Sequence, residues 1–289
     1  MKMKKMLLLL CMLVLPGLSG CLDNDEPGLI QQFALAVRME GYASDAMISL
    51  SRAQASSALF MFTRDTGEAR EAGNQLAAMR KLLEQAKFYA YVPYHKDMLS
   101  SLLERERSLD HAVRTVMERF VELEQYHYNA GMFIDLVYHE LENYGKIQYQ
   151  KNEGLEAYSR SRSCRERLLE IRQSLAVHVE SLHESDLRMA MEALDRLRLF
   201  LQQIEAEEAD AEEREVLSRI NTGMRELGRI LEVFMNASGS ARMAVNEQDI
   251  AFKKAYVEAE RFQQEVRQVT SGLYRKLNPS NLGVGAAVR

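Results

Sequence analysis

A heptad repeat of apolar residues limits what this chain can fold into more than any other feature of the sequence. Alternating steps of three and four residues reach Leu99, Leu102, Glu106, Leu109, Val113, Val116, Phe120, Leu123, His127, Ala130, Ile134, Val137, Leu141 and Tyr144. Twelve of these fourteen positions are apolar, whereas an apolar content of 47% predicts about seven. So long a repeat is typical of helices that pack as in a coiled coil. It predicts one helix over residues 96–150, about 80 Å long, which Gly131 and Gly145 could interrupt.

Similar spacing predicts the remaining helices over residues 29–64, 68–92, 155–204, 211–235 and 241–277. A slip of register near Glu184, Ser185 and Asp186 indicates either a tight hairpin or a kink. The run Asn236-Ala-Ser-Gly-Ser240 is expected to break the helix. No window alternates as a strand would. We therefore predict an all-α fold, an elongated bundle of about six or seven antiparallel helices with long coiled-coil-like helices. It would form one domain over residues 29–277, followed by a flexible tail over residues 278–289.

The first predicted helix is crowded with alanine, serine and glycine, which would allow close approach between helices. A membrane-spanning helix is the rival interpretation of residues 29–64. Charged residues inside it, namely Arg38, Glu40, Asp45 and Arg52, make that interpretation unfavourable.

The amino-terminal segment predicts where the protein resides. Three lysines precede an apolar run over residues 6–15, which is typical of a secretory signal peptide and too short to span a bilayer. The residues Leu18-Ser19-Gly20-Cys21 resemble the lipobox of bacterial lipoproteins at every position. The resemblance implies cleavage between Gly20 and Cys21, a diacylglyceryl group on the Cys21 thiol and an acyl chain on the new amino end. A general secretory signal with a cysteine there by chance is the alternative.

Lipidation would make the bilayer a binding partner through acylated Cys21, because two or three acyl chains give lasting attachment. Residues 22–28 form a short acidic tether that reaches at most about 25 Å. The folded body is therefore expected close to the membrane. By the same resemblance, Leu22 after the cysteine favours the outer membrane, with the protein facing the periplasm.

Charge and cysteine content exclude other classes of function. Removal of residues 1–20 takes away three lysines, and the remaining 34 basic and 42 acidic side chains give a net charge of −8. An acidic chain without a basic stripe is not expected to bind nucleic acid. Of three cysteines, Cys11 leaves with the signal and Cys21 carries lipid, so an internal disulfide is excluded. Cys164 is predicted to be a small core residue, with a reactive or intermolecular thiol as the alternative.

Two Glu-x-x-His motifs could form a metal-binding or catalytic site. Glu124 with His127, and Glu180 with His183, each place a carboxylate and an imidazole on one helix face. Bundle proteins with two iron ions use two such motifs and a glutamate from each of two further helices. A metal-binding bundle is therefore the alternative function. With abundant glutamate the motifs also arise by chance, and His127 and His178 are more readily explained as polar seam residues that fix helix register.

Two further stretches have open interpretations. The aromatic run over residues 88–94 predicts a packed helix end or, alternatively, a contact for a ligand or partner. The acidic run over residues 205–215 predicts a solvated helix junction or a patch for cations or a basic partner, and Asp210 with Glu213 resembles a capping box there.

A lipobox followed by an all-helical body is similar to the YiiG-type envelope lipoproteins, with Tyr144, Tyr149 and Gly154 matching a tyrosine-rich turn. The resemblance implies no enzymatic role. The sequence therefore predicts a non-enzymatic helical scaffold or binding protein, without a cofactor other than its covalent lipid. An envelope protein would bind along its helical seams.

Overall fold

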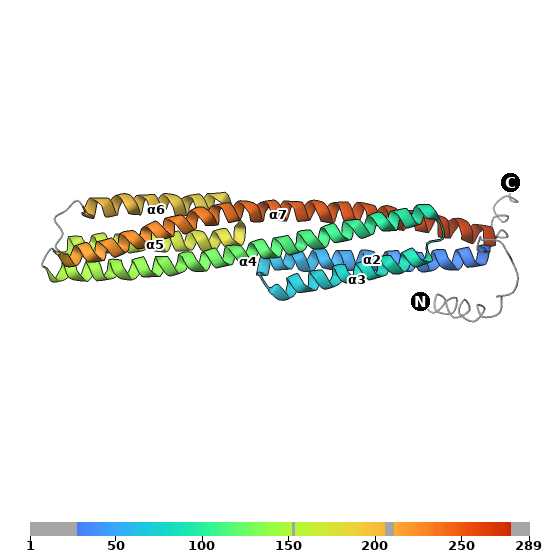
Figure 1. Ribbon diagram of the computed structural model, residues 1–289, viewed down its shortest axis with the longest axis horizontal. Coiled ribbons are helices and arrows are strands. Elements are labelled where there is room, and N and C mark those ends of the chain that lie inside the picture. Colours follow the sequence, from blue (N-terminus) through green and yellow to red (C-terminus); the bar gives the residue numbers. More distant parts are fainter. Residues whose placement is uncertain (1–27, 152–153, 206–210, 279–289) are drawn as a thin grey trace, which may run out of the picture. The chain divides into compact units, whose positions relative to one another are not determined.

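The computed structural model describes residues 28–151, 154–205 and 211–278. Within them it contains six helices and no strand (Figure 1). The helices are α2 (Leu29–Thr63), α3 (Thr66–Tyr89), α4 (Pro93–Gln150), α5 (Gly154–Ser181), α6 (Glu184–Glu205) and α7 (Ala211–Leu277). They pack through buried apolar side chains, which confirms an all-α bundle. The predicted signal peptide, Cys21, the tether up to residue 27 and the tail from residue 279 lie outside the described residues.

The heptad repeat of α4 is confirmed as a buried seam. Thirteen of its fourteen positions are buried, Glu106 among them, and only His127 is partly exposed. Gly131 and Gly145 do not interrupt this helix of 58 residues. Packing of the seam therefore outweighs the low helix propensity of glycine.

The boundary between α3 and α4 differs from the prediction. We expected the earlier helix to reach Val92, but α3 ends at Tyr89, and α4 begins at Pro93 rather than at Lys96. Proline disfavours helical backbone in the residue before it, yet its fixed φ suits the first turn of a helix. Pro93 therefore both limits α3 and starts α4.

The register slip near Glu184 is a tight hairpin and not a kink. The helices α5 and α6 are separated by Leu182 and His183 and lie side by side (Figure 1). Leu182 has a φ of 54°, a left-handed conformation that reverses the chain direction.

The predicted break at residues 236–240 is wrong, because α7 runs without interruption over 67 residues. The steps of three and four residues continue through the run, from Phe234 to Ser238 and Ala241, and all three are buried. A Cβ atom at Gly239 would meet nothing within 4 Å, so this residue points away from the core. A weak helix former on the outer face does not stop a helix whose inner face is packed.

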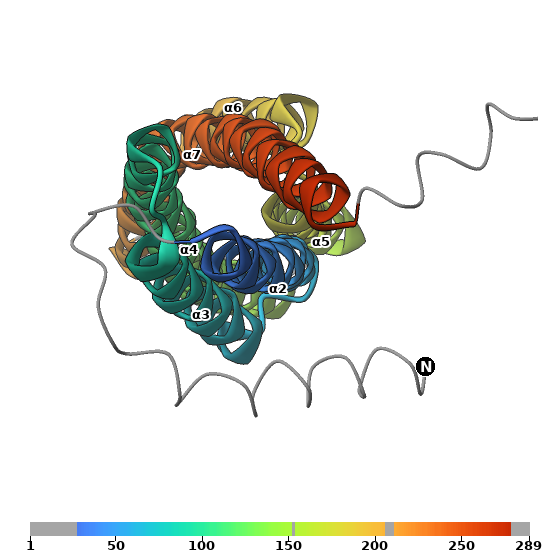
Figure 2. The ribbon, with the colours of Figure 1, turned by 90° about the vertical axis from the view of Figure 1, so that its right-hand side faces the viewer.

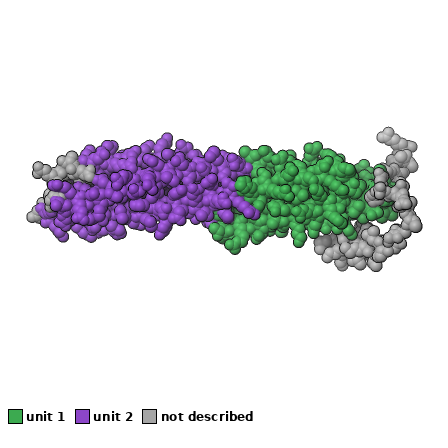
Figure 3. Space-filling view, viewed as in Figure 1, with its two compact units in different colours: residues 1–61, 65–113, 249–289 green, residues 62–64, 114–248 purple. Residues whose placement is uncertain are grey.

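The chain divides into two compact units (Figure 3). Unit 1 comprises residues 1–61, 65–113 and 249–289, and unit 2 comprises residues 62–64 and 114–248. Each unit therefore contains a segment of α4 and a segment of α7. None of the described helices combines the length and the apolar character needed to cross a membrane.

Unit 1 packs α2 and α3, which lie side by side in both views (Figure 1, Figure 2), with the unit's segments of α4 and α7. Its core combines small side chains, many of them alanines of α2 and α3, with larger ones from all four helical segments. The cluster includes Ala43, Ala46, Ala53, Ala72, Ala86, Leu99, Leu102, Leu109, Phe252 and Phe262. Part of the prediction is confirmed, because Ala43, Ala46 and Ala53 face the core, whereas Gly41 and Ala55 are exposed.

Unit 2 packs the α5–α6 hairpin with the other segments of α4 and α7. Its core is rich in branched aliphatic side chains, among them Ile134, Val137, Leu141, Leu168, Ile171, Leu194, Leu197, Ile220, Leu227 and Leu231. Cys164 is buried among the core residues, and burial raises the pKa of its thiol to about 12. A thiol that stays protonated is a poor nucleophile, so Cys164 fits the predicted role of a small core residue.

Candidate functional site

One group of buried polar side chains in unit 2 lies at the α5–α6 hairpin. His178 on α5 is buried, with its Nε2 2.6 Å from Oγ of Ser238 on α7 and its Nδ1 2.7 Å from the backbone oxygen of His183. A carbonyl oxygen only accepts, so Nδ1 carries the proton and Nε2 accepts from the Ser238 hydroxyl. Burial lowers the pKa of His178 and favours its neutral form.

A histidine that accepts from a serine hydroxyl is one requirement of nucleophilic catalysis. In unit 2, however, both side chains are buried, and the second ring nitrogen is held by a backbone carbonyl rather than by an acid. The edge of the His178 ring also packs against Phe234, with centroids 5.5 Å apart. The arrangement satisfies every polar atom of the imidazole and ties α5 to α7, which is the register role predicted for His178.

The hairpin residues cap both helix ends. The Ser181 hydroxyl accepts from the backbone N–H of His183 at 3.0 Å and donates to Asp186 Oδ2 at 2.8 Å. The Asp186 N–H in turn donates to the His183 oxygen at 3.2 Å. The Leu182 N–H donates to the His178 oxygen at 2.7 Å, so groups at the end of α5 and at the start of α6 both have partners that they would otherwise lack. This network explains why a left-handed Leu182 is tolerated.

Arg64 lies against the end of α5. Its Nη2 donates to the backbone oxygen of Val179 at 2.6 Å, and its guanidinium lies 3.6 Å from the centre of the Phe120 ring. Its own backbone is left-handed, with a φ of 61°. Burial lowers the pKa of Arg64, while the charges of Glu124 and Glu180 oppose that shift. The guanidinium thus supplies positive charge at a helix end that carries orphan carbonyl groups.

The two Glu-x-x-His motifs form no metal site within the described residues, and only their glutamates influence Arg64. The carboxylates of Glu124 and Glu180 both act on Arg64. His127 is half-buried on α4 near Arg172, and burial lowers its pKa, whereas the side chain of His183 is exposed. Across residues 28–151, 154–205 and 211–278, no group of three or more histidine, cysteine, aspartate or glutamate side chains could hold a metal ion. The geometry therefore gives the metal-binding alternative no support.

A second polar cluster involves the carboxyl group of Glu213, which is buried. It accepts from Gln148 Nε2 at 2.7 Å and forms an ion pair with Lys151 Nζ at 3.0 Å. The predicted capping box needs Asp210, which lies outside the described residues. Glu213 instead joins α4 to α7, and the prediction of a fully solvated acidic run is wrong at this residue.

Two surface pockets adjoin these clusters. One, of about 520 Å³, is lined by Ser181, Leu182, His183, Glu184, Ser185, Arg242, Val245 and Asn246. The other, of about 400 Å³, is lined by Asn143, Lys146, Ile147, Gln150, Glu212, Glu215, Val216 and Arg219. In the first, Glu184 forms an ion pair with Arg242 at 3.3 Å, so its charges neutralise each other. Neither has the apolar lining with a few converging polar groups that is typical of small-molecule sites.

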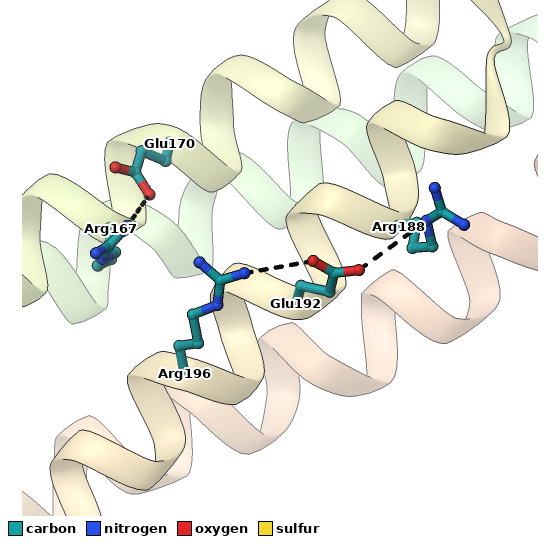
Figure 4. Close-up of polar contacts among 5 residues, drawn as sticks. All are labelled: Arg167, Glu170, Arg188, Glu192 and Arg196. Atoms are coloured by element: carbon teal, nitrogen blue, oxygen red, sulfur yellow. Dashed lines mark hydrogen bonds and ion pairs between the residues drawn. The ribbon is translucent and has the colours of Figure 1, made fainter.

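Both charged and apolar side chains lie on the outer surfaces of the unit 2 helices. On α5 and α6 charged side chains pair along the same helix: Arg167 with Glu170, and Glu192 with both Arg188 and Arg196 (Figure 4). On α4 an apolar face lies outward. Its residues Val121, Tyr128, Met132 and Leu136 are about half exposed or more.

The predicted aromatic run over residues 88–94 is packed only in part. Tyr89 stacks on Tyr42 with centroids 5.6 Å apart, and the Arg38 guanidinium lies 5.4 Å from the centre of the Tyr89 ring. Phe88 is largely exposed.

Sequence reasoning missed Arg64 and Ser238, and it placed Glu213 in a capping box rather than in a buried contact. Ser238 had a signal, since it stands at a seam position between Phe234 and Ala241. Arg64 and Glu213 had the same signal, since Arg64 stands four residues after buried Phe60 and Glu213 stands four residues before buried Leu217.

Comparisons with known proteins add no relative. No protein-family model matches the chain, and no curated protein matches it significantly.

Proposed function

We propose that this protein is a bacterial envelope lipoprotein whose helical body is a non-enzymatic scaffold or binding surface for another envelope protein. The lipobox at Leu18–Cys21 and the short acidic tether support the location. Acylated Cys21 would hold the chain to the outer membrane, facing the periplasm.

The observation that carries the binding role is the second apolar face of α4. Val121, Tyr128 and Met132 are seven and four residues apart, a spacing that places them on one side of the helix. Tyr128 is 65% exposed. The seam side of the same helix is already filled by unit 2, so the partner would bind outside the bundle and not in an open seam. An apolar helix face of this kind suits a partner helix.

Site-specific photo-cross-linking in cells tests the binding role. A photoreactive amino acid in place of Tyr128 should give a discrete adduct with one other protein. The matched control is Gln173, an exposed polar residue of α5 in the same unit, which should give none. Equal labelling at both positions, or none at Tyr128, would contradict a binding face on α4.

Fractionation tests the anchor separately. The Cys21→Ser variant should move from the membrane to the soluble fraction, and mass spectrometry of the parent should find a diacylglyceryl group on Cys21. A variant that stays bound to the membrane as firmly as the parent would contradict lipid anchoring.

A further inference from the structure

The helix α2 carries an apolar stripe on the side that faces away from the core of unit 1. Its large residues Ile30, Val37, Ile48 and Leu59 are exposed by 73, 41, 47 and 45%. At 100° per residue they fall within about 40° of arc, on one line along the helix. Gly41 and Ala55 lie between them on the same line and are also exposed. We call these six residues the outer stripe.

The outer stripe has a symmetry about its middle residue. Val37 and Leu59 are each eleven residues from Ile48, while Gly41 and Ala55 are each seven residues from it. If a second α2 packs on the first in the opposite direction, Ile48 meets its own copy. Val37 then meets Leu59, and Gly41 meets Ala55. Small residues would thus face small residues, and the two helices could approach closely.

Charges beside the outer stripe follow the same symmetry. Asp45 and Arg52 stand on one edge of the stripe, about 40–60° from its line. Both are exposed, and within the described residues neither forms an ion pair. In an antiparallel pair of helices like edges face each other, so Asp45 of each copy lies beside Arg52 of the other. In a parallel pair this edge would face the opposite one, which carries Ser44 and Ser51.

We propose that the outer stripe of α2 is the interface with a second copy of this chain, packed antiparallel about a twofold axis at Ile48. A self-complementary patch is what a twofold dimer requires. A different protein or a lipid surface would account for the apolar residues. Neither would account for the reciprocal placement of Asp45 and Arg52.

Disulfide cross-linking of the purified full chain tests the direction of packing. The parent is the background control, because buried Cys164 is poorly reactive. Ile48→Cys should form a disulfide dimer on mild oxidation. Val37→Cys alone and Leu59→Cys alone should not, whereas a mixture of these two variants should give a mixed dimer. Gln85→Cys, at an exposed position on α3, measures random collision.

A charge exchange provides a second, independent readout. Asp45→Arg alone or Arg52→Asp alone replaces two attractive pairs by two repulsive ones and should weaken the dimer roughly tenfold. The double variant should restore the parent affinity, as measured by sedimentation at several concentrations. Far-UV circular dichroism should be unchanged, since both residues are exposed.

The proposal is overturned if Ile48→Cys cross-links no more than Gln85→Cys. Equal self-cross-linking at Val37, Ile48 and Leu59 would indicate parallel packing and would also overturn it. So would a double charge variant that stays as weak as the single ones.

Discussion

Helical glycines contact a facing helix in unit 2 but not in the helix interiors of unit 1. In unit 2 a Cβ atom on Gly223 would lie 2.5 Å from Val137, and one on Gly145 would lie 2.8 Å from the Ser161 hydroxyl, although Gly131 and Gly239 face open space. In unit 1 the helical glycines Gly41, Gly73 and Gly272 would meet nothing within 4 Å. There the buried alanines of α2 and α3 provide the small contacts instead. The effect of a helical glycine on stability therefore depends on what the facing helix places next to it.

Buried polar groups differ between the units as well. In unit 1 the fully buried Glu106 accepts two hydrogen bonds from Arg80, at 2.7 and 2.9 Å. At the hairpin of unit 2 the buried groups are neutral, with His178 and Ser238 bonded to each other. A buried charge is costly to leave without its partner, whereas a neutral pair is less so. The contact at Glu106 should therefore respond more strongly to the loss of a polar partner than the hairpin of unit 2 does.

The largest expected effect tests that difference. Arg80→Ala leaves a carboxylate buried without its ion-pair partner and should destabilise unit 1 by about 3–5 kcal/mol. Hydrogen exchange of peptides from α3, compared with peptides from α6, measures the loss in each unit. The control is Arg105→Ala, whose partner Glu258 is partly exposed and which should cost about 1 kcal/mol or less. Equal losses of stability for the two variants would refute the distinction between a buried and a partly exposed ion pair.

The pH dependence of the same variant follows from its carboxyl group. Burial raises the pKa of Glu106, and Arg80 opposes that shift. Without Arg80 the pKa should rise further, so the folded state binds a proton that the unfolded state lacks. The loss of stability caused by Arg80→Ala should therefore become smaller as the pH falls from 7 towards 5. Urea unfolding at both pH values measures it.

Two glycine variants are expected to change stability in opposite directions. Gly223→Ala should destabilise unit 2 by about 1–3 kcal/mol, because the methyl group collides with Val137 on a facing helix. Gly73→Ala should stabilise unit 1 by up to about 1 kcal/mol, because alanine favours the helix and the space is open. Thermal unfolding of both variants measures this. Two changes of the same sign would show that the facing helix does not decide the outcome.

Arg64 separates side-chain contacts from backbone strain. Arg64→Ala loses the hydrogen bond to Val179 and the contact with Phe120, and should cost about 1–2 kcal/mol. Arg64→Gly loses the same contacts but relaxes the left-handed backbone, so it should be more stable than Arg64→Ala by about 1 kcal/mol. Chemical denaturation of the two variants gives the difference. If glycine were no better than alanine, strain at this turn would be negligible.

The smallest effect concerns histidine protonation. Burial lowers the pKa of His95 in unit 1 and of His178 in unit 2, so the unfolded chain binds protons more readily than the folded one. Stability should therefore fall as the pH drops below about 6.5. His178→Gln should make the loss of stability at low pH smaller when it is measured in α5 peptides. It should leave the loss unchanged in α4 peptides near His95. Hydrogen exchange at pH 7.5 and 5.5, corrected for intrinsic rates, measures it.

Local patterns predicted most of the fold and little of the site. The ends of α2, the seam of α4 and the core position of Cys164 follow from spacing alone. The predicted break at residues 236–240 gave too much weight to the run of asparagine, serine and glycine, because Ser238 and Ala241 continue the seam through it. Glu106 and His178 were recognised as polar seam positions, but their partners Arg80 and Ser238 come from other helices.

The sequence by itself determined which residues of each helix face inward, because the helical repeat is a property of one segment. It also carries the lipobox, on which the proposed location depends. Tertiary structure alone decided what each inward residue meets: Arg80 at Glu106, Ser238 at His178, open space at Gly73 and Val137 at Gly223. The physical reason is that periodicity fixes a direction around one helix axis. A contact, in contrast, depends on which other helix lies in that direction.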